Sequence, residues 1–273
     1  MDASVRLGRI RYINVLPIYY ALEQAYVPNG FHMVRGTPAE LNALLFQGRL
    51  DVSAISSVEY GRHFQEYLLL PELSISTEGD VGSVLLFSRV PFHRLSGKVV
   101  LLSQASATSA ALVKILLYEL YGARPFYHCG PVPRHFPENY YALLAIGDEA
   151  LRLRAAGRYP YFLDLGRAWH ELTGLPFVFG VWAVRRRYYR EKAPEAQAVH
   201  RALLLSKRWG LAALEEICRR ASSLVGLSPT DLHGYFRLLN FDLSDRQQEG
   251  LLTFYRFMYG FGVLTEMPIL RSI

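Results

Sequence analysis

Short apolar runs alternate with amphipathic helical patterns through the first third of the chain. Runs of strand length and helical patterns follow one another at residues 5–13, 17–25, 31–36, 38–47 and 50–55. Alternation of this kind is typical of a parallel sheet covered by helices. The helix at 38–47 has firm limits, because it begins after a good N-cap, Thr37, and ends before Gly48.

The alternation resumes in the middle of the chain and then stops. Strand and helix patterns occur at 98–103, 106–122 and 140–148, and a strand turns into a helix within 161–174. Near the C-terminus the pattern is helical alone, at about 193–221, 228–238 and 243–260. The sequence therefore predicts two α/β units followed by a helical tail.

Two continuous apolar runs, at 83–88 and 177–184, separate these regions. We interpret them as the places where the chain leaves a first lobe and later returns to it. Lobe one then comprises 1–88 and 185–273, including the helical tail, and lobe two comprises 89–184. Ligands of open α/β sheets bind at the carboxyl ends of strands. The predicted fold class is therefore α/β with two lobes and an active-site cleft between them.

The composition is that of a globular protein. Of the 273 residues, 51% are hydrophobic and 20% charged, which excludes a disordered or fibrous chain. The net charge of +6 is too scattered for a nucleic-acid surface, and the run Arg185–Arg187 is typical of solvated surface. No apolar run is long enough to span a membrane, and the start lacks a secretion signal. We expect a cytoplasmic protein without nucleic-acid or membrane partners.

Standard catalytic and cofactor motifs are absent from the sequence. It contains no GxGxxG, GxxxxGK[ST], GxSxG or HExxH, so dinucleotide, P-loop, hydrolase and zincin functions lose their usual support. Cys129 and Cys218 lie too far apart for a zinc or redox pair and are expected to be structural. We expect neither a metal nor an organic cofactor.

Small polar residues follow several predicted strands at the points where helices begin. They are Asn14, Ser56, Ser57, Ser106, Thr108 and Ser109. A helix N-terminus carries about half a positive charge and free N–H groups, which favour carboxylates or phosphates. Ordinary N-capping explains any single one of these residues, whereas several of them facing one cleft would suit a small dianion. Gly82 and Ser83 allow close approach of a ligand or form a plain turn.

Six blocks of the sequence, in order and at family spacing, resemble the chorismate dehydratases of the futalosine route to menaquinone. They are RIRYINVLPIYY (9–20), TPAELNALLFQGRLDVSAISSVEYG (37–61), LLPELSISTEGDVGSVLLFSR (69–89), SQASATSAALVKILL (103–117), LLAIGDEAL (143–151) and DLGRAWHELTGLPFVFGVWAVR (164–185). The resemblance implies a type II periplasmic-binding-protein fold, in which each lobe is a mixed sheet flanked by helices.

The resemblance also implies a hydro-lyase that converts chorismate, a dianion, to the enolpyruvyl ether of 3-hydroxybenzoate without a cofactor. The implied catalytic pair is Asn14 and Ser83. The predicted substrate-binding residues are Ser56, Ser57, Gly82, Ser106, Thr108, Ser109, Gly147 and Asp148. An amide and an unassisted hydroxyl are poor bases. Our hypothesis is therefore that the enolpyruvyl carboxylate of the substrate removes the proton.

Two other functions stay open. The 1,4-dihydroxy-6-naphthoate synthase of the same pathway resembles this family, but it has a His-Glu pair where this chain has Gly147 and Asp148. A glycine cannot abstract a proton. A solute-binding protein would share the fold without catalysis, and a leader or a lipid-attachment cysteine would be expected near its start.

Aromatic and acidic residues near the predicted site have a second interpretation. Tyr12, Trp169 and Trp182 could stack on a substrate ring, but aromatic residues of α/β units belong more often to the core. Asp148 and Asp164 follow predicted strands. We interpret both as helix caps rather than as catalytic acids.

Overall fold

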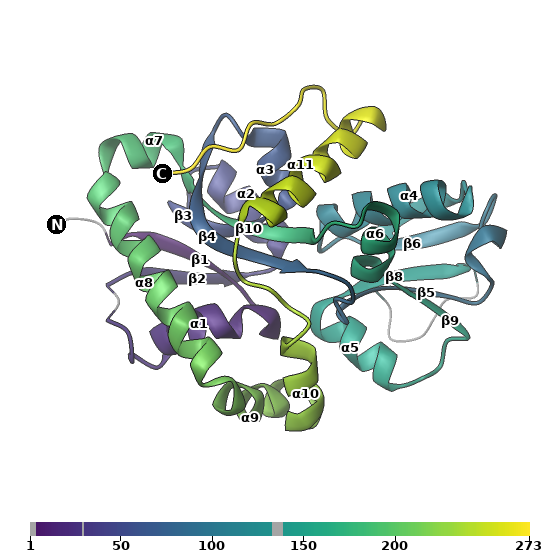
Figure 1. The fold of residues 1–273 in the computed structure, drawn as a ribbon, viewed down its shortest axis with the longest axis horizontal. Coiled ribbons are helices and arrows are strands. Elements are labelled where there is room, and N and C mark those ends of the chain that lie inside the picture. The colour runs from purple at the N-terminus through teal and green to yellow at the C-terminus, as the bar shows by residue number, and fades with distance from the viewer. Residues whose placement is uncertain (1–3, 29, 133–138) are drawn as a thin grey trace.

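The computed structural model describes residues 4–28, 30–132 and 139–273, which form two five-stranded sheets side by side (Figure 1). The strands of the first sheet are β1 (Arg6–Ile10), β2 (His32–Gly36), β3 (Val52–Ser56), β4 (Tyr67–Thr77) and β10 (Phe177–Arg185). Their order is β2-β1-β3-β10-β4. Strand β1 runs parallel to β2 and β3, whereas β10 is antiparallel to β3 and β4. The first sheet is therefore mixed.

The second sheet repeats this plan. Its strands are β5 (Val84–Ser88), β6 (Val99–Ser103), β7 (Phe126–Gly130), β8 (Ala142–Ile146) and β9 (Tyr161–Asp164), in the order β7-β6-β8-β5-β9. Strand β6 is parallel to β7 and β8, and β5 is antiparallel to β8 and β9. The fourth strand in each order is β10 in the first sheet and β5 in the second. Each of these strands follows, along the chain, an element of the other lobe, so two connections join the lobes.

The sheets divide the chain differently from the predicted lobe boundaries at 88 and 184. Those boundaries put the apolar run before residue 88 in lobe one and the run before residue 184 in lobe two. The structure reverses both assignments, because β5 lies in the second sheet and β10 in the first. A continuous apolar run fits the interior of either sheet. The pattern therefore locates the strand but does not say which sheet it joins.

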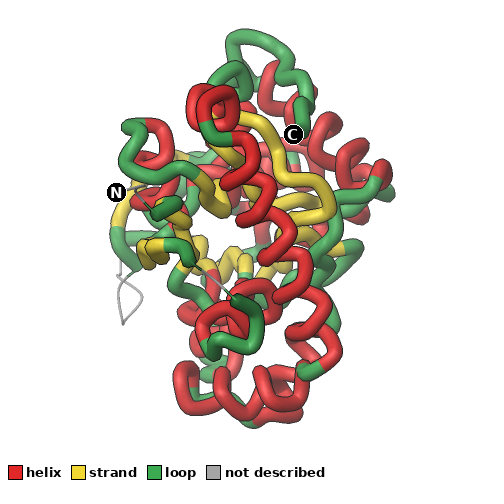
Figure 2. The backbone as a smooth tube through the Cα atoms, turned by 90° about the vertical axis from the view of Figure 1, so that its left-hand side faces the viewer, coloured by secondary structure: helices red, strands yellow, loops and turns green. Residues whose placement is uncertain are grey.

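Helices cover the sheets, and several begin directly where a strand ends (Figure 2). Those of the first lobe are the short 3-10 turn η1 (Ile13–Val15), α1 (Leu16–Glu23), α2 (Pro38–Phe46) and α3 (Ser57–His63). Those of the second lobe are η2 (Phe92–Arg94), α4 (Ala107–Tyr121), α5 (Gly147–Ala155) and α6 (Leu165–Thr173). The start of α2 is as predicted: Thr37 caps it and forms a reciprocal capping box with Glu40.

The helical tail reaches both lobes. It consists of α7 (Arg186–Glu191), α8 (Ala193–Ala212), α9 (Leu214–Val225), α10 (Pro229–Phe236) and α11 (Asp245–Gly260). The predicted helix at 193–221 is divided at Ala213 into α8 and α9. Helix α8 packs along α1, and α11 contacts both β10 and α4 (Figure 1). Of the described helices, none combines the length and the apolar character that crossing a bilayer requires.

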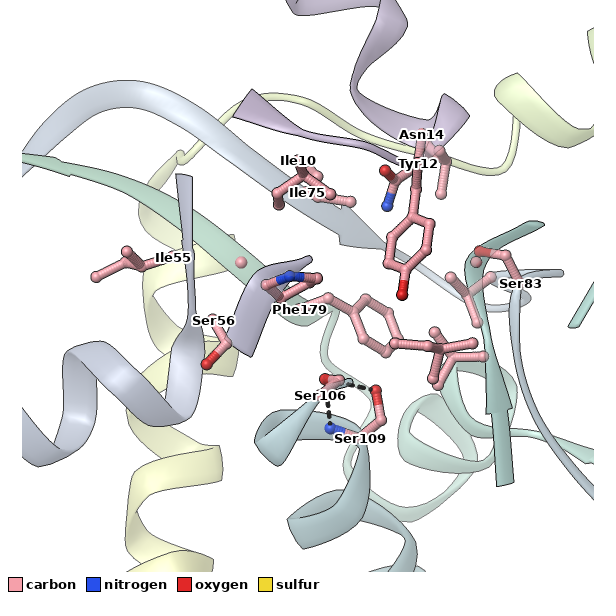
Figure 3. Close-up of a pocket in the computed structure, with 17 residues that line it drawn as sticks. Ile10, Tyr12, Asn14, Ile55, Ser56, Ile75, Ser83, Ser106, Ser109 and Phe179 are labelled. Atoms are coloured by element: carbon pink, nitrogen blue, oxygen red, sulfur yellow. Dashed lines mark hydrogen bonds between the residues drawn. The ribbon is translucent and has the colours of Figure 1, made fainter. Parts of the chain in front are cut away.

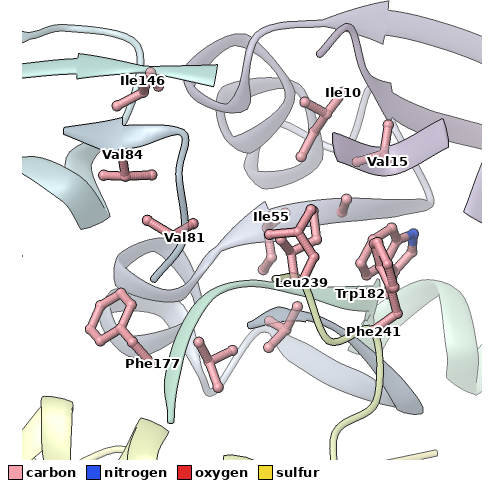
Figure 4. Packing of buried hydrophobic residues seen from close by; sticks show 14 of the residues in the cluster. Ile10, Val15, Ile55, Val81, Val84, Ile146, Phe177, Trp182, Leu239 and Phe241 are labelled. Atoms are coloured by element: carbon pink, nitrogen blue, oxygen red, sulfur yellow. The ribbon is translucent and has the colours of Figure 1, made fainter. Parts of the chain in front are cut away.

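Apolar side chains from both sheets and from the tail pack together near the junction of the lobes. Figure 4 shows Ile55 from the first sheet, Ile146 from the second and Leu239 from the tail. Trp169 and Trp182 are completely buried, each with 0% of its surface exposed. These two tryptophans therefore belong to the core and are not available to stack on a ligand.

Candidate active site

A cavity lies between the lobes, and residues at the ends of strands from both sheets line it (Figure 3). Its volume is about 60 Å³, below the range of about 300–1,000 Å³ that is usual for small-molecule sites. The predicted site residues that line the cavity are Asn14, Ser56, Ser83, Ser106, Ser109 and Gly147. Much of the remaining wall is apolar. The structure therefore brings both members of the predicted catalytic pair to one cavity.

Asn14 comes from the first lobe. It lies in η1, just after β1, and Figure 3 shows its amide group facing the cavity. Its Oδ1 atom is buried and has no hydrogen-bond partner among the residues that the structure describes. Leaving such an atom unpaired costs about 1–3 kcal/mol. A cost of this kind is expected at functional sites rather than in the structural core.

Ser83 lies on the connection between β4 and β5, and a network of main-chain hydrogen bonds holds it in place. Its carbonyl accepts the N–H of Gly147 at 2.7 Å. The Asp164 carboxylate caps α6 and also accepts the N–H groups of Val81 at 3.0 Å and Gly82 at 2.8 Å. Burial raises the pKa of Asp164, and these N–H donors oppose that rise. Asp164 is thus a cap, as predicted, and it also fixes the segment that carries Ser83.

The hydroxyls of Ser56 and Ser106 are arranged to donate hydrogen bonds. The Oγ of Ser56 accepts from the Asn42 side-chain amide at 3.0 Å and from the N–H of Glu59 at 3.2 Å. The Oγ of Ser106 accepts from the N–H of Ser109 at 3.2 Å and from its hydroxyl at 3.1 Å. A serine hydroxyl has two acceptor positions and one proton. With both acceptor positions used, each hydroxyl has only its proton left to offer a ligand.

The electrostatics of the cavity favour an anion without any cationic side chain. Among the described residues that line it, none is charged. Helix α4 begins at the cavity wall after its N-cap Ser106 and has no acidic residue in its first turn. Helix α5 also begins at the wall, at Gly147, but Asp148 and Glu149 in its first turn offset its positive end. Each helix N-terminus carries about half a positive charge. Neutral hydroxyls and the dipole of α4 are therefore the groups available to bind a carboxylate here.

Tyr12 is a further donor on the wall. Figure 3 shows its hydroxyl pointing into the cavity. Burial, together with the nearby carboxylates of Asp148 and Glu149, raises the pKa of Tyr12 to about 12, so the phenol stays protonated at neutral pH. Its ring lies against Gly147 of the second lobe, where an added Cβ would come within 3.0 Å of the ring.

Two predicted binding residues, Ser57 and Thr108, face away from the cavity. The Ser57 hydroxyl donates to the carbonyl of Val178 at 2.5 Å. The Thr108 hydroxyl oxygen accepts the N–H of Val58 at 3.0 Å, which links α4 of the second lobe to α3 of the first. Ser57 and Thr108 are both completely buried. Their hydrogen bonds hold the main chain, and neither side chain lines the cavity.

The predicted binding residues Gly82 and Asp148 form hydrogen bonds within the protein and do not line the cavity. Gly82 adopts a left-handed φ of +69° that favours glycine, and its N–H is committed to Asp164. Asp148 accepts the N–H of Ile13 at 3.1 Å, a bond between the two lobes. Burial raises the pKa of Asp148, and the Ile13 N–H opposes the rise. Asp148 therefore connects α5 to η1 and does not line the cavity. A carboxylate on the wall would repel a dianion.

Sequence reasoning missed two residues that hold the wall in place, Asn42 and Tyr235. Asn42 lies on the buried side of α2 and bonds both the hydroxyl and the N–H of Ser56. Tyr235 lies in α10 of the tail and bonds the Ser83 hydroxyl. A polar residue among the buried positions of the predicted helix at 38–47 was a usable signal for Asn42. No local pattern distinguishes Tyr235 from an ordinary core tyrosine.

The two lobes and the cleft between them form a fold of the periplasmic-binding-protein type. The structure is similar to that of protein AF1704 from Archaeoglobus fulgidus, with a TM-score of 0.76 at 19% identity over 95% of this chain and 98% of that one. It is also similar to the periplasmic aliphatic sulphonate binding protein SsuA from Escherichia coli, with a TM-score of 0.66 at 12% identity over 98% of this chain and 96% of that one. Likeness at such low identity shows the fold alone.

Sequence comparison then gives the family: this chain belongs to the menaquinone biosynthesis family, which matches residues 5–260. The chain is 35% identical to a chorismate dehydratase from Thermus thermophilus over 263 residues, 91% of this chain and 93% of the relative. It is 33% identical to a chorismate dehydratase from Campylobacter jejuni over 176 residues, 63% of this chain and 64% of the relative. The resemblance seen in the six sequence blocks is thereby confirmed.

Proposed function

We propose that this protein is a chorismate dehydratase, a hydro-lyase of menaquinone biosynthesis. Its product is the enolpyruvyl ether of 3-hydroxybenzoate, 3-(1-carboxyvinyloxy)benzoate. The observation that carries the proposal is the 35% identity, over 91% of the chain, to the Thermus thermophilus protein of that name. The cavity supports it, because Asn14 after β1 and Ser83 before β5 both line it.

Chorismate carries two carboxylates, and the cavity offers neutral donors for both. The hydroxyls of Ser56 and Ser106 belong to different lobes and have only their protons left to give. The N-terminus of α4 adds positive potential at the same wall. Donors aimed at developing charge are worth about 2.7–4 kcal/mol each, by analogy with an oxyanion hole. The same groups therefore bind the substrate and stabilise its reacting form.

The reaction is an elimination through a carbanion. The ring hydrogen that leaves is vinylogous to the ring carboxylate, so its removal places negative charge on that carboxylate. Hydroxide then leaves from the neighbouring carbon, and the ring becomes aromatic. Donors around the ring carboxylate lower the barrier to the first step, and a donor at the departing oxygen lowers the barrier to the second.

The proton acceptor is the enolpyruvyl carboxylate of the substrate itself. Among the described residues that line the cavity, none is a His, Glu, Asp or Lys, and neutral amides and unassisted hydroxyls are weak bases. Asn14 orients the enolpyruvyl arm over the ring hydrogen, and Ser83 donates to the departing hydroxide. The two lobes close over the substrate and exclude water from the carbanion.

The proposed location is the cytoplasm, with chorismate as the small-molecule partner. Cys129 and Cys218 are both free thiols, and Cys129 is exposed. Unpaired thiols suit a reducing compartment. Neither nucleic acid nor a membrane is part of the proposed function.

Incubation of the purified protein with chorismate tests the activity. Proton NMR should show loss of the ring diene signals and growth of aromatic signals from the enolpyruvyl ether. Chorismate that binds without change would instead indicate a solute-binding protein, the function named for the fold relative SsuA. Turnover of cyclic dehypoxanthine futalosine, but not of chorismate, would indicate the naphthoate synthase.

The Asn14→Ala and Ser83→Ala variants test the roles of these residues. Each should lower kcat far more than it raises KM for chorismate, because the bonds they make form mainly in the transition state. Equal changes in kcat and KM would mean that the two side chains only bind the substrate.

A further inference from the structure

The helical tail places one polar group directly behind Ser83. The hydroxyl of Tyr235, in α10, donates to the Oγ of Ser83 at 3.0 Å. These two residues are 152 positions apart in the chain, and both are buried, with 5% and 2% of their surface exposed. Leu239, just beyond α10, lines the cavity itself. The tail therefore contributes to the site as well as to the core.

The chain next to Ser83 packs closely against the segment that carries Tyr235. A Cβ added to Gly82 would lie 3.2 Å from the Leu238 side chain and 3.4 Å from the Tyr235 ring. Gly82 also has a φ of +69°, which other residues rarely adopt. Leu238 therefore packs against Gly82 more tightly than a side chain there would allow, while the Tyr235 ring lies at ordinary contact distance.

The direction of this hydrogen bond decides what Ser83 can do. A serine hydroxyl that accepts one hydrogen bond keeps its own proton for donation. Tyr235 remains a donor at neutral pH, because burial raises the pKa of its hydroxyl. A buried phenol hydroxyl also needs an acceptor, and the Oγ of Ser83 is within reach. The proton of Ser83 is then directed away from Tyr235, toward the cavity.

We propose that Tyr235 is a positioning residue, which holds the Ser83 hydroxyl so that its proton faces the hydroxide leaving the substrate. Tyr235 itself does not line the cavity and acts through Ser83. The inference rests on the proposed dehydratase function and adds a residue from the tail to its machinery.

The Tyr235→Phe variant removes only the hydroxyl and tests this role. A hydrogen bond of this kind corresponds to a decrease in kcat of about 3- to 10-fold, with KM for chorismate within about twofold of the wild type because ground-state binding is kept. Tyr67→Phe is the matched control, since Tyr67 is also buried and its hydroxyl bonds Glu59, which does not line the cavity. The control should keep the wild-type kcat.

Melting temperatures of both variants separate positioning from a purely structural role. A Tyr235→Phe variant that melts like Tyr67→Phe but loses kcat supports the proposal. A kcat equal to that of the control, or an increase in KM alone, overturns it. If Tyr235→Phe proves unfolded, Tyr235→Met serves as the second variant, because methionine fills irregular core space, and the same selective loss of kcat is expected.

Chorismate turnover by the wild-type protein distinguishes failure of the proposed function from failure of the proposed role of Tyr235. Absence of chorismate turnover by the wild type contradicts the proposed function. Normal wild-type turnover combined with an unaffected Tyr235→Phe variant contradicts only the role of Tyr235.

Discussion

Replacing Gly147 with alanine would place a methyl group between the two lobes at the edge of the cavity. Gly147 begins α5 of the second lobe, and the Tyr12 ring of the first lobe lies against it. The added Cβ would lie 3.0 Å from two carbons of that ring. Gly147 also has a φ of +60°, in the left-handed region. The substitution therefore has a local main-chain cost and a separate cost in bringing the lobes together.

The two costs can be worked out separately. The left-handed conformation costs a residue with a Cβ about 1–2 kcal/mol, which should appear in the free energy of unfolding. Overpacking against the ring costs about 1–3 kcal/mol and applies only while the lobes are closed. If catalysis requires closure, kcat/KM for chorismate should fall about 5- to 150-fold.

Gly122→Ala is the matched control. Gly122 has a φ of +59° at the end of α4, and a Cβ added there would meet nothing within 4 Å. The assay compares initial rates with chorismate and denaturant unfolding for both variants. The two variants should lose similar stability, while only Gly147→Ala loses kcat/KM. Equal kcat/KM in the two variants would refute the reasoning that closure brings Tyr12 against Gly147.

The remaining predictions concern the residues around the wall. Asn42→Ala should raise KM for chorismate by up to about tenfold in initial-rate assays, because Ser56 loses the amide that holds it; an unchanged KM would count against the donor arrangement. Ser57→Ala should keep kcat and KM within about twofold of the wild type, since its hydroxyl bonds the main chain, and a loss as large as that of Ser56→Ala would contradict this placement. Burial raises the pKa of Asp148 in the folded protein above the value of about 4 in the unfolded chain. Between these pKa values the folded state binds more protons, so the wild type should lose stability relative to Asp148→Asn as pH rises through this window. Denaturant unfolding at several pH values measures the difference, and the opposite trend would show that the ionised form is favoured.

The element types of the fold could largely be predicted from the sequence, because hydrophobic period and capping are local. The start of α2 at Thr37 is an example: cap, proline and acid all lie within one turn. Sheet membership was not predictable in the same way. Strands β5 and β10 are largely apolar, and which sheet they join depends on distant strand pairing.

The residues of the candidate site were likewise predictable only in part. Residues at strand ends, such as Asn14 and Ser106, could be predicted because the carboxyl edge of a sheet is where ligands bind. Neighbouring positions at the same junctions point in different directions. Ser56 lines the cavity, whereas the hydroxyl of Ser57 bonds Val178. Which of the two neighbouring side chains faces the cavity depends on the direction of the first turn of the helix. Tyr235 depends on packing between segments far apart in the chain.

The central claim is that uncharged hydrogen-bond donors bind both carboxylates of the ligand. Its most direct test is a crystal structure of the protein with the enolpyruvyl ether of 3-hydroxybenzoate bound. We predict both carboxylates in the cavity, within hydrogen-bond distance of the hydroxyls of Ser56 and Ser106 and of main-chain N–H groups, with Asn14 and Ser83 beside the ether and the ring. A lysine or arginine side chain in direct contact with either carboxylate, or the product bound outside the cavity, would contradict the account.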